Sequence, residues 1–142
     1  MRGLRSIAVA LAAAGAAACA TGDPAAGPPC PLAQQRAMVV AQLFFGRAIA
    51  GRDPLTDAEW RSFVSDVVGA QFPDGFTAFD GEGQWRDPRT GAVAREPSKV
   101  LIIAAAPSPD LPARLDAVID AYRTRFAQQS VGVMTATACA AF

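Results

Sequence analysis

A short charged segment stands out among the residues whose types and spacing could do chemistry. Arg95, Glu96 and Lys99 place three charges directly before the most apolar run of the chain. A guanidinium, a carboxylate and an ammonium this close together can form a partly buried ion pair or an anion-binding site. The alternative is a charged strand edge, which discourages pairing with the edge of another sheet. The sequence leaves both interpretations open.

Trp85 and Arg86 are neighbours upstream of that segment. Both residue types are enriched at binding hot spots, so the pair predicts contact with a ligand or a partner. The alternative is a tryptophan that covers one end of the core. With the charged segment, the candidate ligand or partner contacts are Trp85, Arg86, Arg95, Glu96 and Lys99.

Carboxylates are the remaining candidates for catalysis. Asp80, Glu82 and Glu96 would supply an acid and a base if they met in a cleft, as in glycoside hydrolysis. Their spacing does not favour that arrangement, and the glycines beside them match neither a calcium loop nor a phosphate loop. Turn chemistry explains these residues, so no catalytic residue is assigned.

The chain contains no histidine. This excludes serine-histidine and cysteine-histidine catalysis, as well as zinc or haem held by histidine. A haem would need Cys30 or Tyr122 as its ligand instead. We therefore expect neither a metal nor a cofactor.

The N-terminal residues have the pattern of a bacterial export signal. Arg2 and Arg5 precede an apolar run at residues 7–18, which is too short to span a bilayer comfortably. The run ends in Ala-Ala-Ala-Cys, which resembles a lipobox and predicts lipidation of Cys19. The small residues also suit ordinary signal peptidase, which would instead give a soluble periplasmic or secreted protein.

These features divide the chain into three parts. Residues 1–18 are expected to be a signal peptide, residues 19–36 a tether rich in Ala, Gly and Pro, and residues 37–142 a single domain. Removing the signal peptide takes two of the 13 basic residues, so 11 basic groups remain against 13 acidic ones. A faintly acidic chain has no basic surface for nucleic acid. The expected membrane contact is the lipid on Cys19.

Two cysteines lie near the ends of the expected domain. In a chain exported to an oxidising compartment, Cys30 and Cys139 predict a disulfide. The alternative is two unrelated thiols.

The first half of the domain reads as a strand and a helix. The apolar residues 37–45, which end before Gly46, predict a strand. Thr56 and Glu59 have the spacing of a capping box, so a helix is expected to begin there and to end at Gly69. The apolar stripe of this helix comprises Trp60, Phe63, Val64, Val67 and Val68.

The second half reads as strands around another helix. Weak alternation at residues 76–79, with turns at residues 80–83 and 87–91, predicts a β-meander, and residues 99–106 predict a central strand. A helix is expected to follow residues 107–110, which supply an acidic first turn, with a last strand at residues 130–137. The buried face of this helix is expected to comprise Leu111, Leu115, Val118, Ile119, Tyr122 and Phe126.

This order of elements predicts an α+β domain. Strand, helix, strands, strand, helix and strand form a ferredoxin-like sandwich (βαββαβ) with an elongated central β-meander and two helices on one face. In that topology the first and last strands are antiparallel neighbours, which would bring Cys30 and Cys139 together.

Several segments together resemble a known family. The chain is similar over about residues 37–142 to a bacterial family of small exported proteins, often lipoproteins, catalogued as domain of unknown function 3574. The resemblance implies no established activity and assigns no catalytic residue. The segments that carry it are residues 71–77 (QFPDGFT), 83–86 (GQWR), 95–101 (REPSKVL), 122–126 (YRTRF) and 128–131 (QQSV), with Gln129 where the family usually has Glu.

Two functional hypotheses follow. The first is a lipid-anchored envelope module that binds another protein or a small ligand through the sheet face or the segment around Trp85. The second is a cofactorless oxygenase or isomerase in which two sheets pair into a homodimeric barrel, an expectation based on analogy of fold. The second requires a sheet-lined cavity holding a perturbed carboxylate or arginine.

Overall fold

The computed structural model describes residues 29–86 and 90–142. The expected signal peptide, Cys19, most of the expected tether and part of the predicted turn at residues 87–91 lie outside these residues. Among the described residues, no helix is long and apolar enough to cross a membrane. The elements are β1 (Arg36–Gly46), α1 (Asp57–Phe63), η1 (Val64–Val68), α2 (Gly69–Gln71), β2 (Thr77–Arg86), β3 (Val93–Ala105), α3 (Leu111–Arg125) and β4 (Gly132–Ala140).

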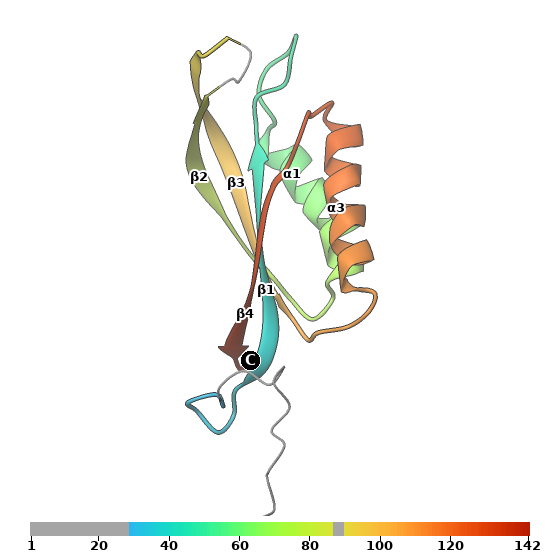
Figure 1. The fold of residues 1–142 in the computed structure, drawn as a ribbon. Helices are drawn as coiled ribbons and strands as arrows, with labels where there is room; N and C mark the ends of the chain where they lie inside the picture. Colours follow the sequence, from blue (N-terminus) through green and yellow to red (C-terminus); the bar gives the residue numbers. More distant parts are fainter. Residues whose placement is uncertain (1–28, 87–89) are drawn as a thin grey trace, which may run out of the picture.

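The four strands form one antiparallel sheet in the order β2-β3-β1-β4. Both helical segments lie on the same side of this sheet (Figure 1). The α+β class is confirmed, as are the antiparallel contact of the first and last strands and the position of the helices. The strands β2 and β4 form the two edges, and the hairpin of β2 and β3 extends beyond the ends of the helices (Figure 1).

The first helix begins as predicted and ends later than predicted. Thr56 is the N-cap, and the capping box with Glu59 is complete. The helical segment then continues through a π-helical turn to Gln71. Gly69 adopts an ordinary right-handed conformation, and the amide of Phe72 still donates to Val68. The expected stop at Gly69 is therefore wrong, because a glycine ends a helix only where the backbone turns left-handed.

The expected meander is instead one long hairpin. Residues 80–83 continue strand β2, and strand β3 begins at Val93 rather than at Lys99. The predicted turn at residues 80–83 is wrong, because its residues pair across the sheet, Asp80 with Lys99 and Gly81 with Ser98. A side chain on Gly81 would come within 3.1 Å of Ser98 Oγ, so the glycine serves close packing here.

An aromatic cluster fills the core between the sheet and the helices. Phe45 from β1 contacts Trp60 and Phe63 from the first helix, and Tyr122 of α3 lies 4.6 Å from Phe45 between ring centroids. The Tyr122 hydroxyl donates a 2.9 Å hydrogen bond to the Gly46 carbonyl. This bond ties α3 to the end of β1.

A disulfide joins the two ends of the domain. Cys30 and Cys139 are bonded as predicted, with a Cα–Cα distance of 5.5 Å that lies in the usual range for a disulfide. Strand β4 runs from Gly132 to Ala140, later than the predicted residues 130–137, and Cys139 pairs opposite Ala37 of β1. The bond therefore fixes the chain preceding β1 to the end of β4.

Candidate functional site

An ion-pair cluster surrounds Lys99, the most buried charged residue among those that the structure describes. Its Nζ lies 2.9 Å from Asp57 Oδ1 and 2.5 Å from Asp80 Oδ1. Arg47 also lies 3.4 Å from Asp57 and 3.8 Å from Asp80. The Lys99 side chain is 8% exposed, whereas the side chains of Asp57 and Asp80 are 59% and 72% exposed. Lys99 therefore forms a buried ion pair, but its partners are Asp57 and Asp80 rather than its neighbour Glu96.

The electrostatics of this cluster oppose catalysis by Lys99. Burial alone would lower the pKa of Lys99, but the hydrogen bonds to Asp80 and Asp57 raise it above its ordinary value. The hydrogen bond from Lys99 and the nearby charges of Lys99 and Arg47 lower the pKa of Asp57. The lysine therefore stays protonated and the aspartate stays ionised, so neither supplies a base or an acid near neutral pH.

The five predicted contact residues do not form one site. Lys99 faces the helices, whereas Glu96 lies on the other face, where its Oε2 accepts a 3.2 Å hydrogen bond from the Ala48 amide. Trp85 is 47% exposed on the face of Glu96. Arg86 and Arg95 take the opposite face by alternation, and Arg86 donates to the Gly91 carbonyl near the hairpin end. Trp85, Arg86 and Arg95 are exposed, whereas Glu96 is half-buried and Lys99 is buried, so the five residues are separated both by face and by burial.

The helix-free side of the sheet carries large exposed apolar side chains. Leu43 and Phe45 lie in the core, so the alternation of β1 places Phe44 on the opposite side. The register extends this assignment, because Phe44 pairs with Val100 and Val100 pairs with Phe79. We call this side the open face. Its large exposed apolar residues are Phe44, Phe79, Trp85 and Met134.

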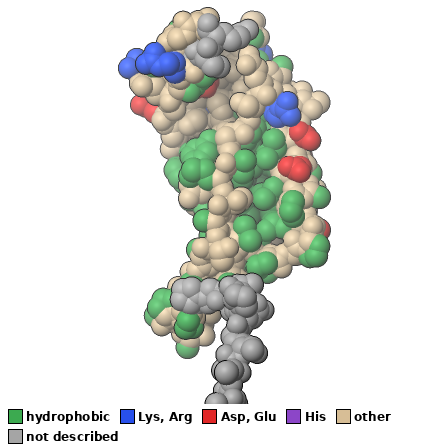
Figure 2. All heavy atoms as spheres, viewed as in Figure 1, with side chains coloured by type: hydrophobic (Ala, Val, Ile, Leu, Met, Phe, Trp, Pro, Cys, Tyr) green, Lys and Arg blue, Asp and Glu red, His purple; other side chains and the backbone are tan. Residues whose placement is uncertain are grey.

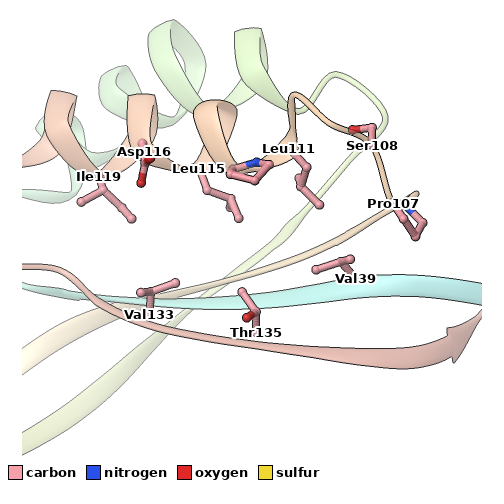
Figure 3. Close-up of a pocket in the computed structure, with 10 residues that line it drawn as sticks. Val39, Pro107, Ser108, Leu111, Leu115, Asp116, Ile119, Val133 and Thr135 are labelled. Carbon is pink, nitrogen blue, oxygen red and sulfur yellow. The ribbon is translucent and has the colours of Figure 1, made fainter. Parts of the chain in front are cut away.

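A groove separates α3 from the edge strand β4 (Figure 3). Its volume is about 390 Å³, and Leu111, Leu115 and Ile119 project into it from α3 toward Val133 and Thr135 of β4. Figure 2 shows hydrophobic side chains on either side of β4, toward α3 and toward the other strands. The remaining lining residues are Val39, Pro107, Ser108, Pro112 and Asp116. This volume lies within the range of ligand sites.

The free edge of β4 borders this groove. Strand β4 has no charged residue and no proline, and its first six residues are exposed. Edge strands usually carry such residues, since unpaired backbone groups otherwise attract another strand. Asp116 is exposed at the groove and forms no ion pair within the described part of the chain. The groove thus combines an apolar floor, an uncharged strand edge and one exposed carboxylate.

The acid–base pair of Asp80, Glu82 and Glu96, which their spacing in the sequence did not favour, does not assemble. Asp80 and Glu96 take opposite faces of the sheet, and Asp80 is held by Lys99. Tyr122 is occupied by its bond to Gly46, and burial raises the pKa of its hydroxyl. Residues 29–86 and 90–142 hold no cluster of three or more Cys, Asp or Glu side chains placed to bind a metal.

Sequence reasoning missed the partners of Lys99 and the groove. Asp57 lies 42 positions before Lys99, and no local spacing connects the two. The groove needs the packing of α3 beside β4, for which the sequence offers only the apolar stripe of α3 and the absence of charge in residues 132–140. The stripe and the absence of charge were the two available signals.

Solved structures share this fold. A phage SAM lyase in complex with S-methyl-5′-thioadenosine matches with a TM-score of 0.58 and 16% identity, over 74% of this chain and 90% of that chain. A phage SAM lyase in its apo state matches with a TM-score of 0.54 and 18% identity, over 75% of this chain and 90% of that chain. At these identities the likeness concerns the fold alone.

Comparison at the level of sequence gives a family without an activity. No curated protein matches the chain. A family model described as "Protein of unknown function (DUF3574)" matches residues 40–142, which confirms the resemblance found in the sequence. The chain therefore belongs to the DUF3574 family.

Proposed function

We propose that this protein is an exported, lipid-anchored binding module, and that the groove between α3 and β4 binds an extended segment of another envelope protein. The free, uncharged edge of β4 beside the groove is the observation that carries this proposal. The expected export signal and the expected lipidation of Cys19 support an envelope location. The order β2-β3-β1-β4 supports a ferredoxin-like sandwich as its scaffold.

The geometry of the groove selects an extended chain as its occupant. A strand added beside β4 would satisfy the unpaired backbone groups of that edge, which is how β-strand addition provides affinity. Alternate side chains of the added strand would point toward α3, because side chains of a strand alternate between faces. They would meet Leu115 and Ile119, which favours apolar residues at those positions.

Charge further defines the occupant. Asp116 lies at the groove and is exposed, so it favours a Lys or Arg on the bound segment. A second copy of β4 brings no cation, because residues 132–140 contain none. The expected ligand is therefore a segment of alternating apolar residues with a basic residue among them.

The probe is a nine-residue peptide in which every second residue is valine and the residues between the valines are threonine or lysine. Titration into the isotopically labelled protein should shift and protect the backbone amides of β4. Val133→Asp should weaken binding at least tenfold, because it places charge in the apolar groove at a side chain that is already 48% exposed. Val93→Asp is the matched control, because Val93 is 39% exposed on the distant hairpin.

A second peptide separates strand addition from simple apolar contact. The same sequence with prolines at its central positions cannot donate backbone hydrogen bonds and should bind far more weakly. Equal binding of the two peptides would contradict strand addition. Unchanged β4 amides at saturating peptide would refute the proposed site.

A second candidate is an enzyme that cleaves a sulfonium compound, favoured by the fold likeness to the phage SAM lyase. Incubation with SAM and detection of S-methyl-5′-thioadenosine by mass spectrometry tests it directly. The binding-module proposal expects no product, in agreement with the paired state of Lys99 and Asp57. Turnover that requires the folded protein would favour the enzyme.

A further inference from the structure

We infer that the open face binds a second copy of this chain, with the two sheets packed face to face and their strands antiparallel. This inference is independent of the groove, which lies on the helix side of the sheet. Its first basis is the apolar character of the open face. Phe44, Phe79 and Met134 are 36%, 48% and 56% exposed there. Exposed side chains of this size on three different strands mark an interaction surface.

The size of the open face suits a dimer. Four strands about 4.8 Å apart, followed over about eight residues of 3.3 Å each, cover about 500 Å² in projection. The relief of the side chains raises the accessible area toward the roughly 800 Å² per partner of a standard interface. The open face is therefore large enough for a stable interface and exceeds what scattered surface residues of a monomer provide.

The charges of the open face select a second copy and its orientation. Within the four described strands, alternation places two charged side chains on this face, Arg36 at the start of β1 and Glu96 at the opposite end. The Glu96 carboxylate lies over Gly46, the last residue of β1, where an added Cβ would come within 2.9 Å of it. Arg36 and Gly46 are the two ends of β1, about 30 Å apart, so the two charges do not meet within one chain.

A two-fold axis in the plane between the sheets and perpendicular to the strands brings these ends together. The start of one β1 then lies over the end of the other, and each Arg36 faces the Glu96 of the second copy. The same operation forms the ion pair twice, as an isologous interface requires. An axis along the strands would instead place each Glu96 near the other, which costs energy. The geometry therefore favours the antiparallel arrangement.

A charge exchange tests the inference. The chain carrying Cys19→Ser, so that the expected lipid does not drive association, is studied by sedimentation equilibrium. The expected mass is that of two chains. Arg36→Glu and Glu96→Arg should each raise the dissociation constant by about tenfold or more, because like charges then face each other at two places. The double exchange should restore most of the affinity.

The double exchange also distinguishes an interface from a local structural role. Glu96 accepts a hydrogen bond from Ala48 within its own chain, and the loss of that bond would not be rescued at Arg36. Arg95→Glu is the matched control, since Arg95 neighbours Glu96 on the other face and should leave the mass unchanged. A wild-type monomer at high concentration would overturn the inference. The inference would also be overturned if neither single exchange changed the dissociation constant of the dimer, or if the double exchange did not restore the affinity.

Discussion

Tyr122 is the only tyrosine of the chain, so its hydrogen bond and its proton can each be measured separately. The side chain is fully buried, and its hydroxyl donates to the Gly46 carbonyl at 2.9 Å. Tyr122→Phe keeps the ring among its aromatic neighbours and removes the donor. The carbonyl loses this partner, which should lower the free energy of unfolding by about 1 to 2 kcal/mol at neutral pH.

This difference should depend on pH with a defined sign. Burial raises the pKa of Tyr122 in the folded protein, whereas the unfolded chain releases the proton near the ordinary value of about 10. Above that pH the unfolded state binds fewer protons than the folded state, so the stability of the wild type falls by about 1.4 kcal/mol per pH unit. Tyr122→Phe has no such proton. The stability difference should therefore shrink to about zero near pH 11.

Urea unfolding of both proteins between neutral and alkaline pH measures this difference. The titration of Lys99 affects both proteins equally and cancels. The ultraviolet absorbance of the phenolate reports Tyr122 directly, and it should remain low until the wild type unfolds. Phenolate that forms at the ordinary pKa in the folded protein would refute the reasoning, as would a stability difference that stays constant with pH.

Three further predictions concern the ion-pair cluster and the disulfide. Lys99→Met should destabilise the protein less than the double change Asp57→Asn with Asp80→Asn. The single change leaves two carboxylates that water already reaches, whereas the double change leaves a buried cation unpaired. Adding Lys99→Met to the double change should therefore recover stability, as measured by urea unfolding. The lowered pKa of Asp57 adds stability above the ordinary carboxyl range that should fade as pH falls through the folded value, and Asp57→Asn should flatten this part of the pH profile. Reduction of the bond between Cys30 and Cys139, which are 109 positions apart, should lower the free energy of unfolding by about 4 kcal/mol, and a melting temperature unchanged by reductant would contradict this.

Local signals in the sequence predicted the elements whose causes are local. The capping box of Thr56 and Glu59 fixed the start of the first helix, since the two residues satisfy each other's backbone amides. The apolar run of β1 was found to within one residue at each end. The order of the elements then brought Cys30 to Cys139, because the first and last strands are neighbours.

The errors occur where a distant residue decides the conformation. Asp80 and Gly81 have the composition of a turn, yet they continue β2 because Lys99 and Ser98 lie opposite them on β3. Gly69 continues its helix for a similar reason, since the chain ends the helix only at Phe72, which packs into the core. Local sequence patterns do not indicate which distant residues will lie opposite a segment in the folded protein.

The candidate site likewise has features that the sequence indicates and features that only the fold creates. The apolar stripe of α3 and the uncharged residues of β4 are readable, but the groove arises from the way they pack. Trp85, Arg86 and Glu96 were chosen by residue type and are separated by strand alternation, which becomes known only with the register.

The two proposed surfaces constrain how the protein would sit at a membrane. The groove lies on the helix side of the sheet and the dimer would use the other side, so both grooves stay accessible in the dimer. Antiparallel packing places the Cys30 ends of the two chains at opposite ends of the pair, about 30 Å or more apart. The two expected lipids on Cys19 would enter one membrane with the least extension of the tethers if the strands lie along its surface. An antiparallel dimer thus favours a flat orientation, in which each β4 edge and its groove run parallel to the membrane and face segments of neighbouring envelope proteins.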